Sequence, residues 1–293
     1  MNRRTALSLL GLGAASLAIG LKPLIAEASS AVWACWIGHS TVLLRLGSTW
    51  VLTDPVMFDA YGVNVLGMTL GPRRIVPPAI TIDRIPRPDL VLLSHAHMDH
   101  MDRRTLTALA DMYPGEIDVI TATNTADVIR DLPWRALNEM DWGEHASLHG
   151  IELTALRVQH NGARMPGEPC RSAGYRRTGR SYNGYYINYD GRGLVFAGDT
   201  AYTTLFRDVK KPVHLAMMPI GAYGTCRDVH CTPEEALAMA EMMKAESVMP
   251  IHHSTFNQLE EPLTEPLERL RIVQSYSPEL SVVATRQGQT FQV

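Results

Sequence analysis

The apolar positions of this chain fall mostly in short continuous runs, a pattern typical of strands that are buried on both faces. Turn-forming residues separate the runs, and Asp190-Gly191 between two of them predicts a hairpin. Strands are therefore expected over residues 32–37, 41–46, 50–53, 89–94, 118–121, 151–159, 185–189, 194–197, 215–219 and 247–251, with a closing strand pair in 280–293.

Helical periodicity appears between these runs. Residues 103–112 carry apolar residues on one face of a helix, and a second helix is expected over 126–132. A third helix is expected from Thr232, which can cap it, to about Lys244, because proline follows the cap and Glu235 occupies the capping-box position. Strands that alternate with helices are typical of an α/β fold.

The N-terminal segment differs from the rest of the chain. Arg3-Arg4 precede an apolar run over 6–21, and Ala26-Glu27-Ala28 has the form of a cleavage site. This pattern predicts a twin-arginine-type signal peptide over 1–28, a periplasmic or secreted location, and one catalytic domain over 29–293. The alternative is an uncleaved membrane anchor, which the length of the run disfavours because a spanning helix needs roughly 20 residues.

Composition narrows the class of partner. The formal net charge is −3, which argues against a nucleic-acid partner and leaves a small molecule or a lipid as the expected substrate. Cys35, Cys170, Cys226 and Cys231 form no C-x-x-C pair, which argues against a cysteine-based zinc site. A disulfide from Cys226 to Cys231 or to Cys170, and burial as free thiols, both stay open.

Four metal-binding residues follow the apolar run 89–94. They are His95, His97, Asp99 and His100. His95 and His97 alternate in an extended segment, so they point the same way and can bind one metal ion. Asp99 and His100 lie around the following turn and can bind a second ion. A loop this short cannot place all four groups on one ion, so the sequence predicts two metals.

Three further candidate ligands follow other predicted strands. They are His160, Asp199 and His252, and residues at strand ends converge on one rim of a sheet. We expect His160 to complete the first metal site, His252 the second, and Asp199 to bridge the two, with Gly198 allowing close approach of the backbone. Such a centre can activate water without a serine or cysteine nucleophile. The nitrogen and oxygen ligands suit two Zn²⁺ ions best and accept Mn²⁺ or Fe²⁺.

Further motifs surround these residues in a fixed order. They are Trp36-Ile37-Gly38-His39-Ser40-Thr41, Leu52-Thr53-Asp54-Pro55, Gly71-Pro72-Arg73-Arg74, Phe196-Ala197-Gly198-Asp199-Thr200, Pro219-Ile220-Gly221-Ala222-Tyr223, His230 with Pro233-Glu234-Glu235-Ala236, and Ile251-His252-His253-Ser254-Thr255-Phe256. With these motifs, residues 33–260 resemble the metallo-β-lactamase-fold superfamily, and within it the branch of the N-acyl-phosphatidylethanolamine phospholipases D and the ascorbate-phosphate lactonases.

The resemblance implies an αββα four-layer sandwich and a full set of ligands. By this resemblance the metal ligands are His95, His97, Asp99, His100, His160, Asp199 and His252. The resemblance also implies catalytic roles for Asp199, Asp99 and His230. His230 is expected to lie near a substrate phosphate. Asp54 is expected to brace the metal loop, as ligating groups usually require. His39 either lines the site or fixes a turn.

The main hypothesis is a dinuclear-metal hydrolase that cleaves a phospholipid-like or other phosphodiester through a metal-bridging hydroxide. A lactonase or other carbonyl-ester hydrolase is the alternative, and a non-catalytic metal-binding protein is disfavoured by the complete ligand set. Peripheral membrane contact is a further expectation, since the apolar segment 56–70 could insert into lipid. The favoured interpretation of that segment is nevertheless a buried loop over the core.

Overall fold

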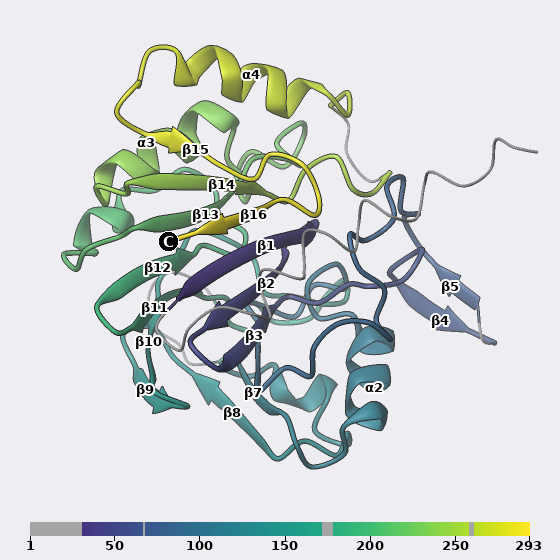
Figure 1. Cartoon of the computed structure of the whole chain (residues 1–293). Helices are drawn as coiled ribbons and strands as arrows, with labels where there is room; N and C mark the ends of the chain where they lie inside the picture. Colours follow the sequence, from purple (N-terminus) through teal and green to yellow (C-terminus); the bar gives the residue numbers. More distant parts are fainter. Residues whose placement is uncertain (1–30, 67, 172–177, 258–260) are drawn as a thin grey trace, which may run out of the picture.

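The computed structural model describes residues 31–66, 68–171, 178–257 and 261–293 (Figure 1). The predicted signal peptide lies outside these residues. Within the described part of the chain, no helix combines the length and apolar character needed to cross a bilayer.

Two seven-stranded sheets form the centre of the molecule. The strands of the first sheet are, in spatial order, β16 (Thr290–Gln292), β1 (Val32–Gly38), β2 (Thr41–Leu46), β3 (Thr49–Thr53), β6 (Leu90–Leu92), β7 (Asp118–Ala122) and β8 (Ala136–Met140). The strands of the second are β15 (Ser281–Val282), β14 (Ser247–Ile251), β13 (Leu215–Pro219), β12 (Arg192–Phe196), β11 (Gly184–Tyr189), β10 (Ile151–Leu156) and β9 (His145–Leu148).

Helices cover the outer faces of both sheets. Helix α2 (Arg103–Met112) packs on the first sheet, whereas α3 (Pro233–Met242) and α4 (Glu265–Gln274) lie on the side of the second (Figure 1). Alternate residues of β1 show the layering, since Ala34 and Trp36 belong to the core between the sheets and Cys35 to the core under α2. The predicted αββα sandwich is confirmed, and burial on both faces explains the continuous apolar runs.

The direction of the strands positions the site. β3, β6, β7 and β8 run parallel, as do β12, β13, β14 and β15. The carboxyl ends of β6, β12 and β14 therefore deliver the segments that follow them to one edge of the sandwich.

The start of α3 follows its sequence signals. Thr232 accepts a hydrogen bond from the Glu235 backbone N–H, the Glu235 side chain accepts one from the Thr232 N–H, and Pro233 takes the first helical position. The helix ends at Met242, two residues before the predicted end.

The predicted helix over 126–132 is wrong. Only Ala126–Val128 forms a short 3-10 turn. The Glu139 carboxylate accepts hydrogen bonds from the N–H groups of Thr125 and Ala126, and the Trp134 indole donates to the Ile129 carbonyl. Pro133 follows Leu132 directly, and helical geometry is disfavoured for the residue before a proline.

The predicted closing strand pair in 280–293 is also wrong. β15 and β16 form, but β15 extends the second sheet beside β14 while β16 pairs with β1 in the first. The strands β8 and β9 and the helix α4 have no counterpart in the sequence prediction. All four cysteines are free thiols, so the structure contains no disulfide between Cys226 and Cys231 or Cys170.

The favoured interpretation of residues 56–70 holds only for its first part. Val56 and Met57 are buried in the core. Further along, β4 (Val63–Val65) and β5 (Met68–Leu70) form a separate two-stranded antiparallel sheet with exposed apolar side chains. This hairpin projects from the body of the molecule beside α2 (Figure 1).

Candidate metal centre

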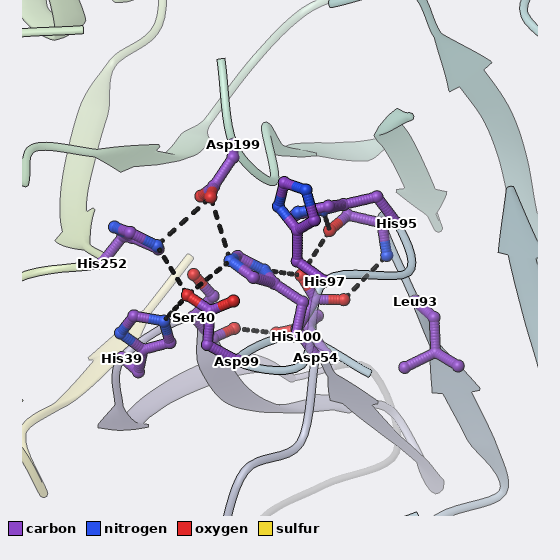
Figure 2. Close-up of polar contacts among 12 residues, drawn as sticks. His39, Ser40, Asp54, Leu93, His95, His97, Asp99, His100, Asp199 and His252 are labelled. Carbon is purple, nitrogen blue, oxygen red and sulfur yellow. Dashed lines mark hydrogen bonds and ion pairs between the residues drawn. The ribbon is translucent and has the colours of Figure 1, made fainter. Parts of the chain in front are cut away.

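All seven predicted ligands meet at one edge of the sandwich. His95 to His100 form the loop between β6 and α2, Asp199 follows β12, and His252 follows β14 directly (Figure 2). His160 lies four residues beyond the end of β10, which is shorter than predicted.

The first group of donors consists of three imidazoles, here called cluster A: His95, His97 and His160. His160 Nε2 lies 3.2 Å from His95 Nε2 and 3.3 Å from His97 Nδ1. Three ring nitrogens directed at one small space fit a cation, because neutral imidazoles at this separation cannot all satisfy one another.

The second group, cluster B, comprises Asp99, His100 and His252, with His39 beside them. Asp99 Oδ2 lies 3.7 Å from His100 Nε2 and 3.5 Å from His252 Nε2. His39 Nε2–H donates to the same oxygen at 3.1 Å and so orients the carboxylate. His39 also fixes a turn, with φ +54° and its carbonyl accepting from the His252 N–H, so it serves both predicted purposes.

Asp199 lies between the two clusters. Its Oδ2 atom is 3.0 Å from His100 Nε2, 3.2 Å from His252 Nε2 and 3.8 Å from His160 Nε2. This is the placement expected of a bridging carboxylate. His230 completes the group, with Nδ1 at 3.8 Å from the same oxygen.

Hydrogen bonds on the far side of the rings set the tautomers. His100 Nδ1–H donates to Asp54 Oδ2 at 2.6 Å, and His160 Nδ1–H donates to the Val229 carbonyl at 2.8 Å. Both rings therefore direct Nε2 toward the centre, where it can bind metal in the unprotonated form. Burial would lower the pKa of His100, but Asp199 and Asp99 raise it well above the usual value for histidine, so this ring must release a proton when metal binds. Asp54 also accepts hydrogen bonds from the backbone N–H and the hydroxyl of Ser94, which confirms that it braces the metal loop.

The unpaired atoms of the centre indicate what it binds. His100 Nε2, His252 Nε2 and Asp199 Oδ1 are buried and have no hydrogen-bond partner among the described residues, although His100 and His252 approach the other Asp199 oxygen closely. Unpaired buried polar atoms are costly. Divalent metal ions would satisfy the two imidazole nitrogens and leave Asp199 Oδ1 free for a water molecule, so the donor set fits two such ions.

The electrostatics agree with a cation site. Burial alone would raise the pKa of Asp199, but His100 and His252 hold it well below its usual range. Burial lowers the pKa of His95 and of His160 well below the ordinary value for histidine, which keeps both rings neutral and able to bind metal. Burial likewise lowers the pKa of His230 to about 4.

Two residues at the site were not predicted from the sequence. Arg164 Nη1 donates to the carbonyls of Ala96 and Met101 at 2.7 and 3.0 Å, which clamps the metal loop from both ends. The ring of Tyr61 stacks 6.5 Å from His39. Neither residue belongs to a short motif, so only the folded structure identifies them.

Metal binding should release protons. Burial alone would lower the pKa of His252, but Asp199 and Asp99 outweigh this effect and raise the pKa to about 9 in the metal-free protein. Metal needs the unprotonated ring, so zinc affinity should rise about tenfold per pH unit per released proton between about pH 7 and 9. The folding stability of the metal-free protein should change with pH in the opposite direction. The raised pKa of His252 stabilises that protein below about pH 6.5, and this contribution is lost as the pH rises through about 9. Calorimetric titration in buffers of different ionisation enthalpy measures the protons, and an affinity independent of pH would contradict the role of His252.

Gly198 is required beside the metal loop. It adopts φ +60°, and a Cβ atom there would lie 2.6 Å from Ser94 Cβ. Gly198→Ala should displace Asp199, cost about 1–3 kcal/mol of stability for the backbone strain with more for the clash, and weaken zinc binding. Gly191→Ala is the matched control, since Gly191 has φ +78° but no atom within 4 Å. Denaturant unfolding and zinc titration of both variants test this, and equal losses would refute a specific role for Gly198.

Known proteins are similar to this chain in sequence and in fold. The chain matches the family model described as "Beta-lactamase superfamily domain" over residues 49–253. An uncharacterised protein of Mycobacterium tuberculosis is 32% identical over 243 residues, which cover 80% of this chain and 62% of that protein. The chain thus spans less than two thirds of that relative's length.

Two other comparisons extend the relationship. The N-acyl-phosphatidylethanolamine-hydrolyzing phospholipase D 1 of Caenorhabditis elegans is 26% identical over 262 residues, covering 84% of this chain and 70% of that one. The crystal structure of an isothiocyanate hydrolase from Delia radicum gut bacteria aligns with a TM-score of 0.66 at 16% identity, covering 88% and 98% of the two chains. The family match includes all seven candidate ligands, and the chain therefore belongs to the beta-lactamase superfamily, with the metallo-β-lactamase fold.

Proposed function

We propose that the protein is a metal-dependent hydrolase that cleaves phosphodiesters, with a phospholipid-like molecule as its substrate. The observation that carries the proposal is Asp199, which lies between two complete donor clusters with His230 beside it. Similarity to a phospholipase D of Caenorhabditis elegans supports the phosphodiester over a carbonyl ester.

We infer that two zinc ions occupy the centre. Cluster A would bind one ion, Asp99, His100 and His252 the other, and Asp199 both. Two bound divalent ions supply a hydroxide at neutral pH and polarise a phosphoryl oxygen. Zinc suits imidazole and carboxylate donors, and the same set accepts manganese or iron.

The side chains around the centre supply orientation and proton transfer. Asp199 Oδ1 is buried and unpaired, so it can hold the attacking water in line and accept its proton. His230 belongs to neither cluster, although it forms a further possible donor group with His160 and Asp199, and its Nδ1 is also unpaired. It can donate a hydrogen bond to a phosphate oxygen or to the departing alkoxide. Asp99 keeps its orientation through His39, which preserves the geometry during turnover.

A substrate panel tests the proposal. The zinc-loaded protein should hydrolyse bis(p-nitrophenyl) phosphate and a phosphatidylethanolamine, a chelator should abolish this activity, and added zinc should restore it. His230→Gln should lower kcat by about 10²–10⁴ while metal content stays constant.

The control for His230→Gln is His145→Gln, because His145 is exposed on β9, and its side chain forms a hydrogen bond with Thr154. Turnover of lactones without turnover of phosphodiesters would overturn the proposal in favour of a carbonyl-ester hydrolase. Bound metal with no turnover on either class would favour a non-catalytic binding protein.

A further inference from the structure

We propose that the β4–β5 hairpin docks the protein on a phospholipid bilayer and holds the metal centre at the lipid surface. The exposed apolar side chains are concentrated at this hairpin and the segment after it. Among the described residues, seven of the thirteen large apolar side chains that are exposed lie between Val63 and Val76. Isolated apolar residues on a surface are normal, whereas a contiguous group of this size marks an interaction site.

The strand register places the apolar residues on one face. Val63 pairs with Leu70, Asn64 with Thr69, and Val65 with Met68. Since side chains alternate along a strand, Val63, Val65, Met68 and Leu70 share one face, while Asn64 and Thr69 occupy the other. The apolar face is thus directed outward, the reverse of the usual arrangement in a water-exposed hairpin.

The tip of the hairpin extends this apolar face. Leu66 is 95% exposed, the highest value of any large apolar side chain in the described structure. An apolar tip that projects from the body of the protein can enter the boundary between head groups and acyl chains (Figure 1).

The base of the hairpin is fixed to the wall of the metal centre. Tyr61 precedes β4, and its ring packs edge-on against Phe256 at 4.9 Å and faces His39. A Cβ atom at Gly62 would lie 2.2 Å from the Leu70 carbonyl oxygen, so the two strands meet too closely there for any larger residue. A bilayer bound by the hairpin would therefore lie near the centre.

The hairpin also lines a cavity of about 540 Å³, through Asn64 and Thr69 of its other face and through Val63. Its lining combines apolar and charged groups: Phe58, Gly62, Val63, Asn64 and Thr69 from the hairpin side, Asp102, Arg103, Arg104, Thr107, Ala108 and Asp111 from the start and body of α2, and Met98, Arg164 and Met165 from the metal loop and the segment beside it. Its volume is within the range of small-molecule sites. The cavity is open beside the metal loop, so it offers an acyl chain a place to leave the bilayer while its phosphate reaches the centre.

Charges at the base of the hairpin favour a lipid surface over a second apolar protein face. Arg73 is exposed and forms a bridge with Ala60 at this base. Arg103 and Arg104 are exposed on the adjacent end of α2, where they pair with Asp131 and Asp59. The guanidinium group of Arg73, at the edge of the apolar face, matches the phosphate layer of a bilayer. The choice of substrate rests on the proposed function, but the docking itself does not require turnover.

Vesicle binding of the full chain tests the docking. Vesicles of phosphatidylethanolamine and phosphatidylglycerol are sedimented with the wild-type protein and with the Leu66→Ser/Met68→Ser variant. The variant should partition at least about tenfold more weakly, because two apolar side chains no longer enter the lipid. Ile272→Ser/Tyr276→Ser is the matched control, since these α4-side residues are 63% and 81% exposed but distant from the hairpin in sequence, and it should partition like the wild type.

The outcomes separate this inference from the proposed function. Equal partitioning of the wild type and the Leu66→Ser/Met68→Ser variant would overturn the docking. A variant that becomes monomeric from a dimeric wild type, with unchanged vesicle binding, would also overturn it and assign the face to a second copy. Wild-type turnover of bis(p-nitrophenyl) phosphate without vesicles tests the proposed function separately, so either can fail while the other stands.

Discussion

Asp199 is a carboxylate with 2% exposure, placed among imidazoles that come from three other segments of the chain. A buried carboxylate costs several kcal/mol unless cations compensate for the lost hydration. Its Oδ2 atom is shared by His100 and His252, and its Oδ1 atom remains unpaired. The two clusters, the site's affinity for cations and the proposed chemistry all depend on this one buried charge.

The fold places that charge through a small number of close contacts. Parallel strands of both sheets end at one edge, and the lack of a side chain at Gly198 lets the segment after β12 approach Ser94. The Asp54 carboxylate accepts hydrogen bonds from both Ser94 and His100. The Arg164 guanidinium donates to a backbone carbonyl of the metal loop. These contacts orient the ligands, which is the support that metal sites require from the residues around them.

Much of this arrangement could be predicted from the sequence because the information was local. The histidines and aspartates follow apolar runs, so their strand-end positions were readable without a structure. Arg164 contacts the metal loop from about 65 residues away, which no local pattern reports. The helix predicted at 126–132 does not form because Glu139 and Trp134, which lie outside that segment, bind its backbone. The exposure of Val63, Val65, Leu66, Met68 and Leu70 could not be predicted either, since it depends on whether another element of the fold covers them. In contrast, α4 had a readable start signal in Pro266 within an acidic first turn.

Clusters A and B would together bind two metal ions, with Asp199 between them. Anomalous X-ray diffraction from zinc-loaded crystals, measured on both sides of the zinc absorption edge, tests it most directly. Two peaks are expected, one enclosed by His95, His97 and His160 and the other by Asp99, His100 and His252, with Asp199 touching both. A single peak, or two peaks of which one lies away from Asp199, would contradict it.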